Sequence, residues 1–150
     1  MGRTKPGRLA RAFDMDRIQH AIEAAERASS GEIVVSVAPF FLGSVRRVAE
    51  QTFERLGVSR TRERNGVLFF VVPSRRQLVV LGDVGIHEKV GQEFWEELVR
   101  AVSERFKAGD GTEGIVSGIG LVGQRLAEHF PHAPDDRNEL PDQPVKARLD

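Results

Sequence analysis

Two short, mostly apolar runs, residues 33–38 and 67–72, constrain the fold of this chain more than any other feature. Both runs are rich in β-branched residues and lie just after a glycine, a combination that is typical of β-strands. Neither run alternates between polar and apolar residues, which is the pattern of strands whose two faces are both covered. A predicted helix separates the runs, so we expect them to pair in parallel through a right-handed crossover.

A third predicted strand, residues 78–81, follows the second after a tight turn at residues 73–76. Strands joined by so short a turn must be antiparallel, so the predicted sheet is mixed. Apolar residues recur at helical spacing in further segments, which are long enough to cover both faces of such a sheet. These segments are residues 15–25, 45–56, 90–106 and 115–130. We therefore predict an α/β fold, an αβα sandwich around a small mixed sheet of about three to four strands flanked by about four helices.

The length of 150 residues suits a single domain, and the composition changes only near the two ends. We predict that residues 13–130 form this domain. Residues 1–12 are rich in basic side chains and are interpreted as a flexible basic arm. Residues 131–150 are polar and rich in proline, so they are interpreted as a tail without a core of its own.

Charge and cysteine content exclude several functional classes. Lys and Arg total 22 and Asp and Glu also total 22, so the charge balance gives no electrostatic case for nucleic-acid binding. The absence of cysteine excludes disulfides, thiol nucleophiles, cysteine zinc sites and iron–sulfur clusters. No apolar run reaches the length of a membrane span, and the basic arm lacks the apolar core of a signal peptide. We therefore expect a cytoplasmic chain with no intrinsic membrane span.

Most short motifs in the chain fail their structural context. A G-x-G-x-x-G match at residues 109–114 follows a predicted helix instead of a strand, so it is interpreted as a helix–helix loop in which Asp110 opens the last helix. An Asp-x-Asp pair that begins at Asp14 opens a predicted helix, where acidic side chains favour the macrodipole. His129 and His132 have no evident third ligand, which disfavours a metal site there. Neither a P-loop nor a G-x-S-x-G nucleophile motif occurs, and no organic cofactor is expected.

Charged side chains are predicted to converge where the third strand ends. Because this strand runs antiparallel to the second, its exit at Asp83 should lie beside the entrance of the second strand at Asn65. The first strand runs parallel to the second, so its entrance at Glu32 belongs to the same edge. The predicted rim contains Glu32, Arg62, Glu63, Arg64, Asn65, Asp83, His87 and Glu88.

Two interpretations of this rim stay open. In the first, carboxylate and amide oxygens bind Ca²⁺ or Mg²⁺, which prefer such ligands, and neighbouring arginines bind a phosphate. The predicted metal ligands are Asp83, Glu88, Glu32 and Asn65, and the predicted phosphate ligands are Arg62 and Arg64. In the second, the segment is a strand-to-helix corner in which Asp83 caps a short helix and glycines supply special backbone angles. The structural positions of that corner are Gly66, Gly82, Gly85 and His87.

Residues 62–68, Arg-Glu-Arg-Asn-Gly-Val-Leu, and residues 82–91, which begin Gly-Asp-Val-Gly, resemble the TPM domain family and in particular its soluble bacterial branch. Residues 106–115 and 138–141 look similar to that branch as well, and the similarity covers residues 10–142. The resemblance implies an αβα sandwich around a small mixed sheet. It marks five motif positions, Asn65, Gly66, Gly82, Asp83 and Gly85.

Members of this family include thylakoid lumen proteins linked to photosystem II repair and assembly, and a membrane protein associated with acetylcholine receptors. Acid phosphatase activity and divalent-cation binding have been attributed to some members. The resemblance therefore implies a divalent-cation-binding interaction module with a membrane-protein or assembly partner. The alternative is a weak metal-dependent acid phosphatase for phosphomonoesters, in which a cation held by Asp83 and Glu88 activates a water. Because the sequence shows no nucleophile, we prefer the interaction module.

Overall fold

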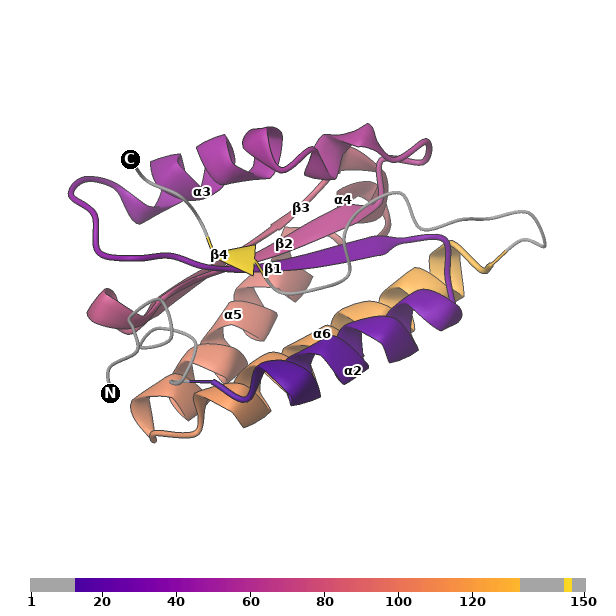
Figure 1. The fold of residues 1–150 in the computed structure, drawn as a ribbon. Helices are drawn as coiled ribbons and strands as arrows, with labels where there is room; N and C mark the ends of the chain where they lie inside the picture. The colour runs from indigo at the N-terminus through magenta and orange to yellow at the C-terminus, as the bar shows by residue number, and fades with distance from the viewer. Residues whose placement is uncertain (1–12, 133–144, 147–150) are drawn as a thin grey trace.

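A computed structural model describes residues 13–132 and 145–146 of the chain (Figure 1). The predicted basic arm and most of the predicted tail lie outside the described residues. The elements, in chain order, are α2 (Met15–Arg27), β1 (Glu32–Val37), α3 (Val45–Arg55), the 3₁₀ turn η1 (Val58–Arg60), β2 (Gly66–Val72), the 3₁₀ turn η2 (Pro73–Arg75), β3 (Gln77–Gly82), α4 (Val84–Val90), α5 (Gln92–Lys107), α6 (Gly111–His129) and β4 (Val145–Lys146). No helix among these elements has the length and apolar character that a membrane crossing needs.

The four strands form one mixed sheet in the order β3-β2-β1-β4. β1 and β2 pair in parallel, with Glu32 opposite Gly66, and β2 and β3 form an antiparallel hairpin with Val67 opposite Gly82. The predicted parallel crossover and the predicted hairpin are both confirmed. β4 has only two residues and pairs in parallel with β1. It comes from the segment interpreted as a tail, where so short an element leaves no strand signal in the sequence.

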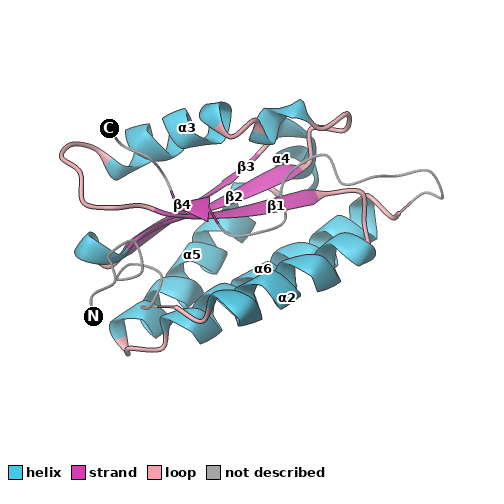
Figure 2. Ribbon diagram, in the orientation of Figure 1, coloured by secondary structure: helices cyan, strands magenta, loops and turns pink. Residues whose placement is uncertain are grey.

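Helices cover both faces of this sheet (Figure 2). α2, α5 and α6 lie on one face, and α3 lies on the other. Along β1, Ile33 and Val35 pack toward the three-helix layer, whereas Val34 packs toward α3. Every residue of β1 and β2 is buried, which explains why these runs lack an alternation of polar and apolar residues. The predicted αβα sandwich is confirmed.

The two predicted helix starts differ in how they are capped. The carboxylate of Asp14 accepts the backbone N–H of Arg17 at 3.2 Å, so Asp14 caps α2 as predicted. α6 begins at Gly111, which confirms a short helix–helix loop before it. Asp110 precedes α6 but makes no capping hydrogen bond with its side chain. Its backbone N–H donates to the carbonyl oxygen of Arg105 at 2.8 Å, and its side chain pairs with the same arginine, so the residue is held toward α5.

Two glycines of α6 allow this helix to approach its neighbours closely. A Cβ atom at Gly118 would lie 3.1 Å from the Phe69 ring, and one at Gly123 would lie 2.9 Å from the Cβ of Ala25. These positions therefore bring α6 against the sheet and against α2. Gly120 faces open space, so packing does not require a glycine there.

Candidate functional site

The hairpin brings the end of β3 beside the start of β2, as predicted. The backbone N–H of Asp83 donates to the carbonyl oxygen of Gly66 at 2.9 Å. Asn65 precedes Gly66 in the chain, and Glu32 lies opposite Gly66 on the neighbouring strand. The backbone positions of the predicted rim therefore share one end of the sheet.

Arg64 and Asp83 form a two-point ion pair at this rim. The Nε atom of Arg64 donates to Oδ2 of Asp83 at 2.6 Å, and Nη2 donates to Oδ1 at 2.9 Å. The side chain of Asp83 is 5% exposed, whereas that of Arg64 is 49% exposed. The hydrogen bonds to Asp83 are the main cause that raises the pKa of Arg64 above its ordinary value, and the negative charge of Asp83 is the second cause. The guanidinium therefore stays charged at any working pH.

Asp83 also fixes the start of α4. Its Oδ1 atom accepts the backbone N–H of Val84 at 2.8 Å, so Asp83 is the helix cap that the sequence predicted. The carbonyl oxygen of Arg64 accepts the N–H groups of Gly85 at 2.8 Å and Ile86 at 3.3 Å. The first turn of α4 is thereby bound to the loop before β2, in which Arg64 adopts a left-handed φ of 52°.

Three glycines make this close approach possible. A Cβ atom at Gly85 would lie 2.1 Å from the carbonyl oxygen of Glu63, and one at Gly66 would lie 2.3 Å from that of Val58. A Cβ atom at Gly82 would lie 2.2 Å from the Trp95 ring. None of the three glycines has a positive φ, so the expected reason, special backbone angles, is wrong for them. They are required because other groups occupy the space of a side chain.

Asn65 is buried at the same rim. Its backbone N–H donates to the hydroxyl of Thr61 at 3.0 Å, and its Nδ2 donates to the hydroxyl of Ser30 at 3.0 Å. Ser30 in turn donates to the carboxylate of Glu63 at 2.6 Å. The Oδ1 atom of Asn65 is buried and accepts no hydrogen bond. This oxygen therefore has unused capacity to accept a donor or to bind a cation.

The predicted metal ligands do not form a ready cage. Both carboxylate oxygens of Asp83 bond to Arg64. Glu32 is buried and shares a sheet face with Gly66, and Glu88 is exposed on α4. In the part of the chain that the structure describes, no three His, Asp or Glu side chains come close enough together to hold a metal ion. The residues present therefore do not fit a cation centred on Asp83 while the ion pair is intact.

The remaining predicted residues have separate surroundings. Arg62 is exposed on the loop before β2. Arg64, the second predicted phosphate ligand, already binds the carboxylate of Asp83. His87 accepts a hydrogen bond at Nδ1 from Nε1 of Trp95 at 3.1 Å, which places its ring beside α5.

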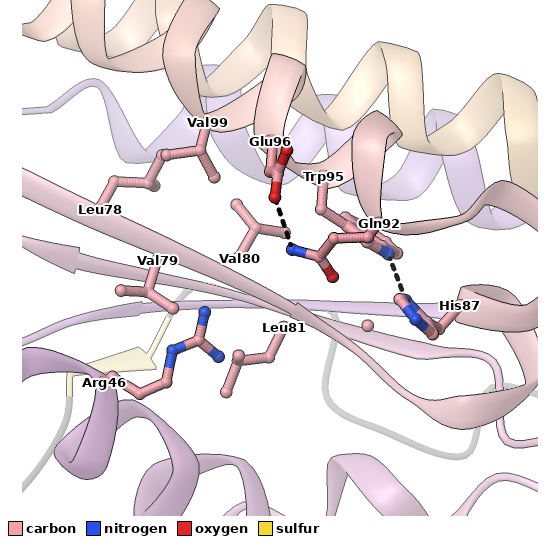
Figure 3. Close-up of a pocket in the computed structure, with 11 residues that line it drawn as sticks. Arg46, Leu78, Val79, Val80, Leu81, His87, Gln92, Trp95, Glu96 and Val99 are labelled. Carbon is pink, nitrogen blue, oxygen red and sulfur yellow. Dashed lines mark hydrogen bonds between the residues drawn. The ribbon is translucent and has the colours of Figure 1, made fainter.

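A groove along the outer edge of β3, which the sequence did not predict, encloses about 400 Å³ (Figure 3). Gln92, Trp95 and Val99 of α5 form one wall. Arg46 of α3 lies on the other side of the strand, and His87 lies at one end. We call this feature the β3-edge groove. Its lining also includes Leu78, Val79, Val80, Leu81, Gly82 and Glu96.

The backbone of β3 has hydrogen-bonding groups that face this groove. In an antiparallel pair, successive residues alternate between bonding to the neighbouring strand and pointing away from it. The bond between Asp83 and Gly66 sets the phase of this alternation. It follows that the N–H and C=O groups of Leu78, Val80 and Gly82 point away from β2. No strand among the described residues pairs with that edge.

Solved structures with the same fold include one that is also similar in sequence. The BA42 protein from the psychrophilic bacterium Bizionia argentinensis has a TM-score of 0.81 and 34% identity, over 90% of this chain and 95% of that one. The N-terminal domain of a P. gingivalis protein has a TM-score of 0.64 and 21% identity, over 76% of each chain. The N-terminal domain of the cg2496 protein from Corynebacterium glutamicum has a TM-score of 0.59 and 15% identity, over 79% of this chain and 74% of that one. The last two similarities show the fold alone.

Comparison with protein families assigns the chain directly. No curated protein matches it significantly. The family model of the TPM domain matches residues 9–125. These residues include all the strands and helices that form the rim and the β3-edge groove. The chain belongs to the TPM domain family.

Proposed function

We propose that this TPM domain is a non-catalytic interaction module that binds an extended segment of a partner protein along β3. The β3-edge groove is the observation that carries the proposal. It combines outward-facing backbone groups at Leu78, Val80 and Gly82 with a cavity of about 400 Å³. An added peptide strand gains main-chain hydrogen bonds from such an edge, and pockets beside it select alternate side chains.

The composition of β3 supports this use of its edge. Proteins usually protect an exposed edge strand with charges, proline, bulges or a covering segment. Between Leu78 and Leu81 the strand has only apolar residues and neither a charge nor a proline. Such an edge is prone to pairing with another chain, which supports a role in binding.

The groove walls indicate which segment fits. Successive side chains of an added strand point to opposite faces of the sheet. On one face, Trp95 and Val99 offer apolar surface, so we expect an apolar peptide residue there. On the other face Arg46 offers a positive charge, so we expect an acidic peptide residue beside it.

Divalent-cation binding is a second candidate property of the same domain. The buried and unbonded Oδ1 atom of Asn65 favours it, since Ca²⁺ and Mg²⁺ bind to oxygen atoms of this kind. No observation at the rim favours the phosphatase alternative, because Asp83 and Arg64 satisfy each other. Hydrolysis of p-nitrophenyl phosphate that EDTA abolishes and Asp83→Ala reduces would overturn the non-catalytic proposal.

A displayed library of random peptides tests the proposed function without a known partner. Peptides selected on the immobilised full chain would be synthesised, and their affinity would be measured from the fluorescence of Trp95, the single tryptophan of the chain. We expect selected peptides to alternate apolar and acidic residues. Val80→Pro removes one outward N–H group, so it should abolish binding. The backbone of the variant should still fold, because proline is tolerated on the free side of an edge strand.

Two further variants keep this test decisive. Val99→Arg obstructs the groove without a change in the backbone of β3 and should also abolish binding. Arg100→Gln changes an exposed position on α5 outside the groove lining and should leave the affinity unchanged. Selected peptides that bind equally well to the folded Val80→Pro and Val99→Arg variants would refute the proposal.

A further inference from the structure

The loop between β1 and α3 exposes two large apolar side chains. Phe40 is 69% exposed and Leu42 is 82% exposed, whereas Phe41 between them is only 8% exposed. Phe41 packs against Phe70 of the sheet, with ring centroids 6.2 Å apart. The loop is therefore anchored by its middle residue while the two flanking residues face solvent.

Arg75 from the β2–β3 turn holds this loop in place. Its Nη1 atom donates to the carbonyl oxygen of Gly43 at 2.6 Å, and its Nη2 atom donates to the carbonyl oxygen of Phe41. Its guanidinium also lies 4.5 Å from the centroid of the Phe41 ring. Phe40 and Leu42 are thus presented on a fixed backbone, which lowers the conformational cost of using them in binding.

Exposed arginines lie on the two segments next to this apolar pair, the start of α3 and the β2–β3 turn. Arg46 and Arg47 are exposed in the first turn of α3, and Arg76 is exposed directly after Arg75. Arg46 has a long contact with Glu50 at 3.9 Å. Arg47 and Arg76 form no ion pair with any other described residue. The first turn of α3 contains no acidic residue, although cations there oppose the helix macrodipole. The positive charges of Arg46 and Arg47 are therefore not explained by the macrodipole of α3.

We propose that this end of the domain docks on an anionic lipid surface. Phe40 and Leu42 enter the boundary between headgroups and acyl chains, while Arg47 and Arg76 contact lipid phosphates. Apolar side chains beside basic ones are the combination that binds interfacial membrane surfaces. The loop projects beyond the end of the sheet (Figure 1), so it presents a tip to a surface instead of receiving a ligand. The two arginines assigned to lipid phosphates, Arg47 and Arg76, do not line the β3-edge groove.

Co-sedimentation of the full chain with large unilamellar vesicles tests this proposal. Vesicles of phosphatidylcholine mixed with phosphatidylglycerol should bind the protein, and vesicles of phosphatidylcholine alone should bind it much more weakly. The double variant Phe40→Ser with Leu42→Ser should lose at least about tenfold in affinity for the mixed vesicles. Arg47→Gln and Arg76→Gln should each lose about fivefold, and added salt should weaken binding further.

Matched variants elsewhere on the surface control for general effects. Leu121→Ser removes a 44% exposed apolar side chain from α6, and Arg100→Gln removes an exposed arginine from α5. Both should bind the mixed vesicles as the wild type does. The proposal is overturned if the wild type does not bind these vesicles, if binding does not depend on the anionic lipid, or if the two control variants lose as much affinity as the loop variants.

Discussion

Arg64 binds both carboxylate oxygens of Asp83, and one of these oxygens also caps α4. The pair connects the loop before β2 with the helix after β3, two segments that lie 19 residues apart in sequence. It therefore fixes the geometry of the rim through a contact within the chain. A charge that looks available for a ligand in the sequence is already neutralised in the fold.

Removal of the Asp83 carboxylate should destabilise the domain through two lost interactions. Asp83→Ala removes the cap of α4, which costs about 1–2 kcal/mol in the free energy of unfolding, and the lost ion pair adds to this. Asp83→Asn keeps an oxygen that can cap the helix and removes only the charge, so it should lose less. Urea denaturation measures both variants. Asp110→Asn breaks an exposed pair with Arg105 and should change stability little. Equal stability of Asp83→Ala and the wild type would contradict this account.

Two glycine substitutions should have opposite effects on stability. Gly85→Ala places a Cβ atom 2.1 Å from a backbone carbonyl oxygen, so we expect a loss of about 2–3 kcal/mol. Gly120→Ala faces open space inside α6, so we expect a gain of about 1 kcal/mol from higher helix propensity. Thermal and urea unfolding measure both. A neutral Gly85→Ala variant would show that the loop before β2 can move away from α4.

The sequence predicted the parts of this fold that depend on local chemistry. The short turn at Pro73–Arg75 requires a hairpin, and the unbroken apolar strands require cover on both faces. The same hairpin correctly placed Asp83 beside Asn65. The bond between Arg64 and Asp83 was not predicted, because strand order tells which residues share an edge and not which side chains meet. Asp83 was therefore predicted to be a ligand of a divalent cation, whereas in the structure it binds the guanidinium of Arg64.

The β3-edge groove depends on long-range features that the sequence does not show. β3 is an edge strand because no other strand in the described part of the chain pairs beside it, and β4, which has only two residues, occupies the opposite edge of the sheet. The walls of the groove come from α3 and α5, which lie far apart in sequence. The run of apolar residues in β3 was visible, but it fits a central strand equally well.

Divalent-cation affinity should depend on Arg64. We expect weak binding of Ca²⁺ and Mg²⁺ by the wild type, because the guanidinium occupies the Asp83 carboxylate. Arg64→Gln frees that carboxylate and should raise the Ca²⁺ affinity by about tenfold. Isothermal titration calorimetry measures this, with Arg62→Gln as a control for a neighbouring exposed arginine. Tight binding by the wild type that is lost in Asp83→Asn would show instead that a cation displaces Arg64.

Amide hydrogen exchange should reveal the free edge of β3 directly. The N–H of Val79 bonds to β2, whereas that of Val80 points into the β3-edge groove, so Val80 should exchange at least about tenfold faster. Side-chain burial predicts the reverse order, because Val80 is 5% exposed and Val79 is only partly buried. The comparison therefore separates backbone bonding from burial. Binding of a selected peptide should slow exchange at Val80 and leave Val79 unchanged. Slow exchange at Val80 in the free protein would show that another segment already covers this edge.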